Sequence, residues 1–207
     1  MGTQTGRAAR FQAKHNDILE AAKAVFLRRG FARASVDELA SEAAVSTATL
    51  YRHFKSKEAL FAAVAGMSLR SMDDVLPTPG TDPIEGLSVV ARGYAALLSS
   101  PETRRLMRML IAETGDGGAM ATAFYETVKL QLSDRFVACV NAGVDAGQLR
   151  PVPTQQRPEI AGQLQGMIEH ATLMRGLVLG DTIDLGARTP DDIANEAVAT
   201  WLARWSV

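Results

Sequence analysis

The chain has very little of what secreted, metal-binding or membrane-spanning proteins depend on. Its 207 residues include a single cysteine, Cys139, so no internal disulfide can form and a reducing, intracellular setting fits. No stretch of 18 residues is both free of charge and apolar enough to cross a bilayer. Because no apolar run follows the basic N-terminal residues, we expect no signal peptide. These absences predict a cytoplasmic protein.

Signatures of catalysis and of metal binding are also missing. The sequence contains no P-loop, no HExxH and no G-x-S-x-G motif. Its three histidines, His15, His53 and His170, are far apart, and one cysteine cannot complete a typical zinc site. The glycine-rich segment 115–118 lacks the context of a phosphate loop and is predicted to be a plain loop. We therefore predict a non-enzymatic protein without metal or cofactor.

What the sequence does contain is helical periodicity. Strand signals are scarce and apolar residues recur at helical spacing almost throughout, which predicts an all-α fold. The first helix carries apolar residues over 18–26 and ends at Gly30. Further along the chain, a proline-rich segment at 77–83 is predicted to be a loop. The pattern predicts nine helices, three in an N-terminal head (residues 1–58) and six in a C-terminal body (residues 59–207).

The body contains three long helical patterns. One runs from about 119 to 146, and a second begins after Pro153 and ends near Gly180. The last opens at Thr189 with proline in the first turn and reaches Trp205. A chain of this size can bury a sufficient core without a disulfide or a metal ion.

The stretch from Ser35 to Lys57 carries the most information. It reads SVDELASEAAVSTATLYRHFKSK and holds two short helical patterns separated by a turn. Ser35 and Glu38 form an S-x-x-E pattern, which predicts a capping box at the start of the first helix. This layout is typical of a helix-turn-helix, whose second helix enters the DNA major groove. We expect the exposed face of that helix to carry Thr47, Thr49, Tyr51, Arg52 and His53.

The chemistry of these side chains suits DNA. Hydroxyl groups suit phosphate oxygens. Arg52 suits either a phosphate or a guanine edge, and it is a better candidate than His53 for a sequence-dependent contact. His53 is as well placed to orient its neighbours as to contact DNA, and a packing role is the alternative for Tyr51. Lys57 lies at a helix start, where backbone N–H groups bind anions. Three basic residues precede the first helix and are predicted to reach the DNA backbone or the minor groove: Arg7, Arg10 and Lys14.

The charge of the chain is unevenly distributed. Residues 1–60 hold 10 lysines and arginines against 6 acidic residues, a net charge of +4. The remainder holds 12 against 17, a net charge of −5. Such asymmetry is expected when only one end of a protein meets phosphate.

The run ILEAAKAVFLRRGFARASVDELASEAAVSTATLYRHFKSKEALFAAV, residues 18–64, resembles the N-terminal domain of TetR-family transcriptional regulators. The resemblance implies that Thr47, Thr49, Tyr51 and His53 lie on the recognition helix. It also implies that Ser35 and Lys57 meet phosphates.

Two positions depart from the family pattern. Ala44 stands where the turn usually carries glycine, and Ala48 stands where glycine or proline is frequent. If Ala44 keeps a left-handed conformation, it costs on the order of 1–2 kcal/mol; the alternative is a slightly different turn. Either change is expected to shift base preference rather than abolish DNA binding.

The same resemblance implies that the body holds a small-molecule pocket and forms a dimer through its last two helices. Apolar residues at heptad-like spacing in these helices support a helix–helix seam, although such stripes can also face the protomer's own core. The predicted dimer residues are Ile160, Leu164, Ala171, Val178, Val198, Trp201 and Trp205.

The pocket is expected to combine adaptable methionines, aromatic rings and a few polar groups. A core role is the alternative for each of these residues. The candidates are Met107, Leu110, Glu113, Met120, Phe124, Tyr125, Met167, His170 and Met174. Cys139 lies in an apolar helical segment and is expected to be inert packing.

These features predict a homodimeric, ligand-responsive DNA-binding regulator. The favoured form is a repressor that leaves a palindromic operator in double-stranded DNA when a small, largely apolar molecule binds the body. Activation is an alternative, because it depends on where the operator lies. Two further alternatives are a DNA-binding regulator without a small-molecule effector and an all-α ligand-binding or enzymatic protein that has lost DNA binding.

Overall fold

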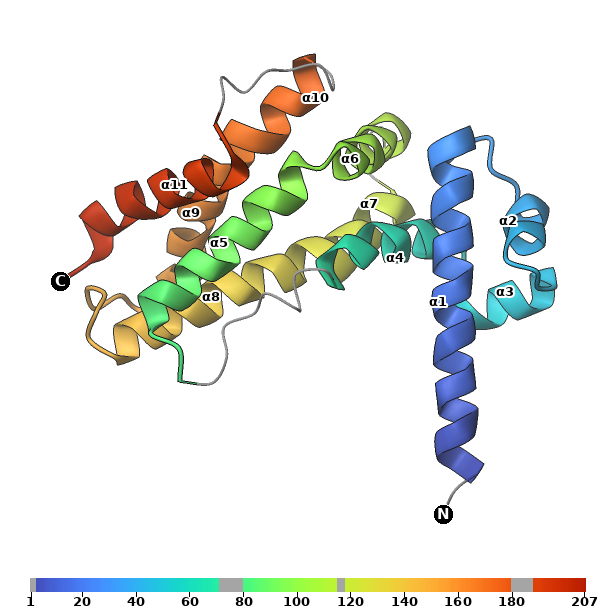
Figure 1. Ribbon diagram of the computed structural model, residues 1–207, viewed down its shortest axis with the longest axis horizontal. Coiled ribbons are helices and arrows are strands. Elements are labelled where there is room, and N and C mark those ends of the chain that lie inside the picture. Colours follow the sequence, from blue (N-terminus) through green and yellow to red (C-terminus); the bar gives the residue numbers. More distant parts are fainter. Residues whose placement is uncertain (1–2, 71–79, 115–117, 180–187) are drawn as a thin grey trace. The chain divides into compact units, whose positions relative to one another are not determined.

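The computed structural model describes residues 3–70, 80–114, 118–179 and 188–207, and it confirms the all-α prediction for them (Figure 1). No strand occurs within these ranges, where the only β-type pairing is an isolated bridge between Leu149 and Ser206. None of the described helices is long and apolar enough to cross a membrane.

The chain divides into two compact units. Unit 1 comprises Met1–Met67 and Arg108–Val128, and unit 2 comprises Ser68–Met107 and Lys129–Val207. The boundary at residue 58 between head and body concerns function, and it stays a prediction.

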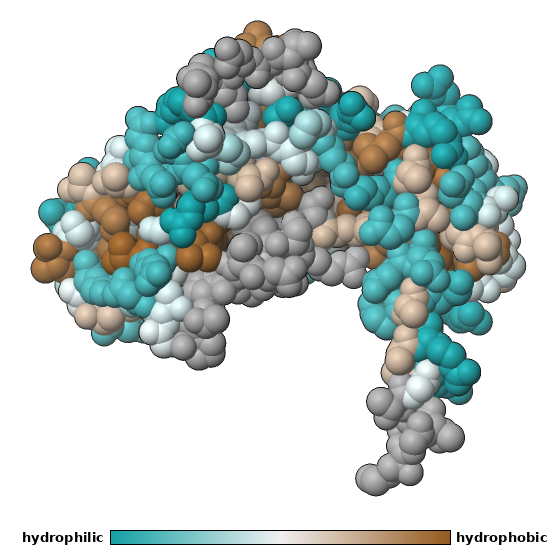
Figure 2. All heavy atoms as spheres, viewed as in Figure 1, coloured by the Kyte–Doolittle hydropathy of each residue, from teal (hydrophilic) through white to brown (hydrophobic). Residues whose placement is uncertain are grey.

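Unit 1 begins with four helices. They are α1 (Thr3–Arg29), α2 (Val36–Glu42), α3 (Thr47–His53) and α4 (Lys57–Arg70). The predicted stop of α1 at Gly30 is confirmed, with a left-handed φ of 78° at this glycine. Hydrophilic side chains cover most of the visible surface of α1 and α2 (Figure 2).

The beginning of α1 corrects one expectation. Arg7, Arg10 and Lys14 do not precede the first helix, because α1 already starts at Thr3. These cations therefore lie on a helix rather than on an extended arm.

A cluster of aromatic rings forms the core beneath the helix-turn-helix. Phe26 of α1 is fully buried, and its ring centroid lies 5.3 Å from that of Phe61 in α4. Phe31, from the loop after α1, meets Phe61 edge-on at 5.5 Å. Leu39 and Leu50 are also buried, so α2 and α3 each bury a leucine. Burial of these large apolar side chains fixes the position of α3.

The capping box predicted at Ser35 is only half formed. The Ser35 hydroxyl oxygen accepts a hydrogen bond from the Glu38 backbone N–H at 3.1 Å. The Glu38 carboxylate does not return to the backbone of Ser35 but accepts from Arg29 Nε at 3.1 Å. A complete capping box occurs instead at the start of the last helix, between Thr189 and Asp192.

The remaining helices confirm the long patterns read from the sequence. The helix predicted over 119–146 is the continuous run of α7 (Ala119–Phe124), the π-helical η2 (Tyr125–Lys129) and α8 (Leu130–Asp145). The two other long helical patterns of the body are also present, and so are the helices expected to begin at Asp82-Pro83 and at Ser100-Pro101, together with a 3-10 turn. Their bounds are α5 (Pro83–Ser99), α6 (Pro101–Thr114), η3 (Thr154–Gln156), α9 (Arg157–Glu169), η4 (His170–Met174), α10 (Arg175–Leu179) and α11 (Pro190–Trp205).

Unit 2 is built around α5, which packs against α8, α9 and α11. Tyr94 of α5 is 1% exposed and meets the fully buried Phe136 of α8 edge-on, with ring centroids 5.4 Å apart. Trp201 of α11 is also buried, and its indole N–H donates to the Ile160 carbonyl of α9 at 2.9 Å. Large apolar side chains thus join four helices in one core.

Candidate nucleic-acid interface

The turn between α2 and α3 contains a left-handed residue, which is one of the two alternatives considered for Ala44. Ala44 has a φ of 50°, and it is the only described non-glycine residue with a positive φ. The Val45 N–H donates to the Ala40 carbonyl at 3.0 Å and so closes the turn. Since an L-residue is strained in this conformation by roughly 1–2 kcal/mol, the turn retains strain that glycine would relieve.

Replacing Ala44 with glycine is expected to stabilise the protein by about 0.5–1 kcal/mol. The relief of strain exceeds the entropy that glycine adds to the unfolded chain, roughly 0.4–1 kcal/mol. Urea unfolding followed by circular dichroism measures the change. Ala48→Gly is the matched control, because this exposed alanine lies in α3 and its replacement should destabilise by roughly 0.5–1 kcal/mol. Destabilisation by Ala44→Gly would contradict the expectation.

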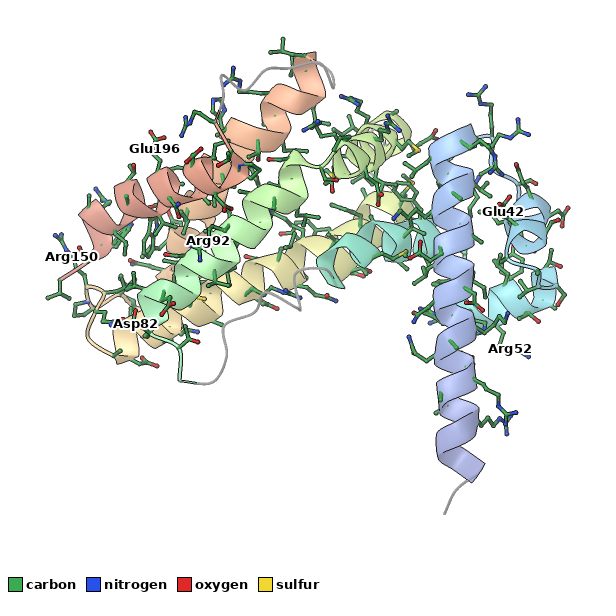
Figure 3. All side chains as sticks on the ribbon, in the orientation of Figure 1. Glu42, Arg52, Asp82, Arg92, Arg150 and Glu196 are labelled. Carbon is green, nitrogen blue, oxygen red and sulfur yellow. The ribbon has the colours of Figure 1, made fainter. Side chains whose placement is uncertain are left out.

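The exposed face of α3 carries the side chains predicted to read DNA. Tyr51 is 50% exposed and Arg52 is exposed, whereas Leu50 is buried on the inner side of the helix. Thr47 and Thr49 are half-buried. Arg52 lies at the end of α3 that meets α1 (Figure 3).

The start of α3 is fixed by Ser46. Its hydroxyl oxygen accepts from the Thr49 backbone N–H at 3.2 Å, and its hydroxyl donates to Thr49 Oγ1 at 3.1 Å. The Thr49 hydroxyl is therefore held in place by the N-cap, which leaves its own proton to donate to an external acceptor.

His53 packs between α3 and α1. Its ring stacks on Phe11 of α1 with centroids 4.1 Å apart and an interplanar angle of 20°. Its Nδ1 is buried and has no hydrogen-bond partner within the described residues. Burial lowers the pKa of His53, and the nearby charges of Arg52 and Lys14 lower it further. This packing favours the orienting role over a direct DNA contact.

Lys57 joins α4 to the loop that precedes α2. Its Nζ donates to the carbonyl oxygens of Phe31 at 3.0 Å and Ala34 at 3.2 Å, and it lies 4.3 Å from the centroid of the Phe31 ring. An ammonium group has three donors, so one proton remains for a phosphate. Ser35, the next residue after this loop, is exposed. The phosphate contacts of Ser35 and Lys57 stay predictions.

Comparison with known proteins identifies the family. Residues 18–64 match the profile of "Bacterial regulatory proteins, tetR family". Residues 85–207 match that of the "AefR-like transcriptional repressor, C-terminal domain". The chain belongs to the TetR family. It is a DNA-binding transcriptional regulator.

Individual relatives agree with this assignment. The TetR-family chain is 28% identical to the transcriptional regulator UidR of Escherichia coli K12, over 90% of this chain and 87% of UidR. A TetR-family regulator from Mesorhizobium loti has the same fold, with a TM-score of 0.76, 24% identity and coverage of 96% of this chain and 99% of that chain. The flavonoid-responsive regulator FrrA matches with a TM-score of 0.69, 27% identity and coverage of 94% and 98%.

The predicted pocket residues of this TetR-family regulator are divided between the two units. In unit 1, Leu110 and Met120 are buried and Phe124 is half-buried, whereas Glu113 and Tyr125 are exposed. The residues that belong to unit 2 are Met107 and Met167, which are half-buried, and His170 and Met174, which are exposed. Because the set is divided in this way, a common pocket stays a prediction.

Unit 2 contains a partly buried polar cluster that the sequence pattern did not reveal. The Tyr94 hydroxyl donates to the Glu169 carboxylate, which also forms an ion pair with Lys129. Burial, followed by the Glu169 charge, raises the pKa of Tyr94 well above its ordinary value. One helical turn before Glu169, Gln165 is 3% exposed and its amide nitrogen has no partner within the described residues. The only sequence feature that could have indicated this cluster is Tyr94 itself, because a tyrosine buried among apolar residues usually needs a hydrogen-bond partner for its hydroxyl.

A groove of about 320 Å³ lies between α5 and α8. Its walls include Asp82, Val90, Arg135 and Cys139. Burial raises the pKa of the Cys139 thiol, which keeps it protonated and supports the packing role expected from the sequence. Within the described ranges, no group of three or more histidine, cysteine or acidic side chains could hold a metal ion.

The predicted dimer residues differ in burial within one protomer. Ile160, Leu164, Val198 and Trp201 are buried in unit 2. The three that keep exposed surface are Ala171 and Trp205, both half-buried, and Val178, which is 75% exposed. The dimer interface stays a prediction, and residues already buried in one copy can contribute little to it.

Proposed function

We propose that the protein is a homodimeric repressor that leaves a near-palindromic operator when a small, largely apolar molecule binds the C-terminal region. The observation that carries the proposal is the construction of α3. Arg52 and Tyr51 face solvent on a helix whose opposite side is fixed by the buried Leu50. A rigid helix with an exposed arginine is what base-edge recognition in the major groove requires.

The C-terminal helices support the dimer. Three large apolar side chains are exposed in η4 and α10: Met174, Val178 and Leu179, with exposed fractions of 49%, 75% and 62%. Neighbouring exposed apolar side chains mark an interaction surface more often than an isolated one does. A two-fold dimer would place two copies of α3 about one DNA turn apart, roughly 34–36 Å.

The polar cluster of unit 2 supports an effector. The buried amide of Gln165 lacks a partner, and the nearby Glu169 carboxylate joins Tyr94 to Lys129. Groups of this kind orient a ligand within an otherwise apolar site. The relative FrrA is a flavonoid-responsive regulator, which supports a small organic effector here. The effector must bind the DNA-incompetent state more tightly, and a coupling of roughly 1–3 kcal/mol changes DNA affinity about 5- to 150-fold.

Replacing Arg52 with alanine tests whether α3 recognises a specific DNA sequence. On an operator duplex selected from random DNA, we expect the variant to bind roughly 5- to 150-fold more weakly for each half-site occupied, because one base-edge contact is worth about 1–3 kcal/mol. Fluorescence anisotropy at two salt concentrations, against scrambled DNA of equal length, measures the change. The wild type should prefer the operator by about 10³ or more.

Arg150→Ala is the matched control, since it removes the same charge from unit 2. It should bind like the wild type. Equal and weak binding of the wild type to both duplexes would contradict the proposed function. Once binding is established, loss of anisotropy on addition of candidate molecules identifies the effector.

A further inference from the structure

The first turns of α1 extend past the helix-turn-helix. α1 is continuous from Thr3, and Figure 1 shows it running on toward the N-terminus beyond α3. The exposed cations Arg7 and Arg10 and the half-buried Lys14 are spaced by three and four residues, so they share one face of the helix. Seven residues of helix extend over about 10 Å, a length along which one DNA strand carries about three phosphates.

An aromatic contact holds this extension against the recognition helix. Phe11 is 46% exposed, yet one face of its ring is covered by His53 at 4.1 Å. One turn further along α1, His15 stacks on Phe54 with centroids 4.6 Å apart. Phe11 and His15 are spaced by four residues, so they lie on one face of α1, next to the face that carries the cations.

The two contacts fix the cations relative to α3. The ring centroids of His15 and His53 lie 5.7 Å apart, so their chain neighbours Lys14 and Arg52 belong to adjoining parts of α1 and α3. Lys14 also forms an exposed ion pair with Asp17 at 3.1 Å, which a phosphate can replace. The first turns of α1 extend past the helix-turn-helix, and a short helical segment without packing partners is marginal in water. Their orientation therefore depends on the Phe11–His53 stack.

We propose that the first turns of α1 form a second DNA-binding element, in which Arg7, Arg10 and Lys14 contact the phosphate backbone beside the major groove occupied by α3. In this arrangement His53 is a positioning residue that holds Phe11, and it does not read a base. The inference rests on the proposed function, because it assumes that α3 lies in the major groove.

The test compares charge removal at two places on the protein. We expect the double variant Arg7→Ala/Arg10→Ala to bind operator and scrambled duplexes more weakly by the same factor. The slope of log K against log salt should become shallower by about 1.8 for each bound protomer, since each phosphate contact contributes about 0.9. The control Arg92→Ala/Arg150→Ala removes two charges from unit 2 and should keep the wild-type slope.

A second set of variants tests the stack. Phe11→Ala and His53→Ala should both weaken binding to either duplex, although Phe11→Ala removes no charge. His53→Phe keeps an aromatic ring and removes both nitrogens, so it should restore binding if His53 acts by stacking. Circular dichroism establishes that each variant is folded.

Two results would overturn the inference alone. One is a wild-type salt slope in Arg7→Ala/Arg10→Ala while the wild-type protein still selects its operator. The other is weak operator binding by His53→Phe with unchanged binding to scrambled DNA, which would make His53 a reader of bases. Failure of the wild type to prefer the operator would contradict the proposed function instead, and the slope on scrambled DNA would still test the cations.

Discussion

Replacing Trp201 with alanine is expected to lower the free energy of unfolding of unit 2 by about 3–5 kcal/mol. The Trp201 side chain is 3% exposed and lies on α11, which packs along α5. Its indole N–H donates to the Ile160 carbonyl, so the same side chain also joins α11 to α9. Truncation leaves a cavity among three helices and removes a buried hydrogen bond. Since domains are stable by only about 5–15 kcal/mol, unit 2 would retain little stability.

Urea unfolding followed by far-ultraviolet circular dichroism measures this loss without depending on tryptophan fluorescence. Trp201→Phe separates the two contributions, because it keeps an aromatic ring and loses the hydrogen bond. It should cost less than the alanine variant, with the hydrogen bond contributing about 1 kcal/mol. A loss below about 1 kcal/mol in Trp201→Ala would show that the Trp201 site is not a packed core.

The corresponding variant in unit 1 is Phe26→Ala, which should cost about 3–5 kcal/mol and abolish operator binding at moderate temperature. Phe26 is fully buried, and its ring contacts those of Phe31 and Phe61 at 5.8 and 5.3 Å. These rings connect α1, the following loop and α4, which support the helix-turn-helix. Loss of this core therefore releases α3 although no DNA-contacting residue has changed.

Thermal unfolding and operator anisotropy, recorded on the same preparation, test this expectation. Phe26→Leu retains most of the apolar volume and should lose less stability while it still binds DNA. Full operator affinity in a strongly destabilised Phe26→Ala would contradict the dependence of α3 on this core.

Local patterns made much of unit 1 predictable. Gly30 ends α1 and the N-cap Ser35 precedes α2, as predicted, because each of these signals acts within one turn of the chain. The polar run of α3 could be read as a binding face, since Leu50 alone supplies its buried contact. For the turn at Ala44 the family pattern left two alternatives, and the structure has the left-handed one.

Contacts between distant residues were not predictable from these patterns. Glu38 pairs with Arg29 rather than with the backbone of Ser35, because folding brings the end of α1 next to α2. The stack of Phe11 on His53 joins residues 42 positions apart. Only the continuation of the apolar face of α1, through Phe11 and His15 to Ile18, hinted that the helix begins so early.

The heptad-like stripe from Ile160 to Val178 shows a further limit. The sequence treats it as one face of one helix, but the structure buries Ile160 and leaves Val178 exposed. The π-helical η4 lies between the two positions and adds a residue to the turn, which changes the face that later residues occupy. Spacing alone cannot reveal such a turn. The cluster of Tyr94 and Glu169 was equally hidden, because its members lie on separate helices.

The position of Lys57 determines where a chimeric protein could join this DNA-binding region to another C-terminal domain. Its ammonium group holds the carbonyls of Phe31 and Ala34, so the first residue of α4 is part of the architecture that presents Ser35 and α2. A hybrid regulator that joins this DNA-binding module to the sensor of another family member should therefore take its crossover downstream of Lys57. A crossover placed immediately after α3 would remove Lys57 and its hydrogen bonds to Phe31 and Ala34. The loop before α2 would then lose these contacts, and α2 would be less firmly held.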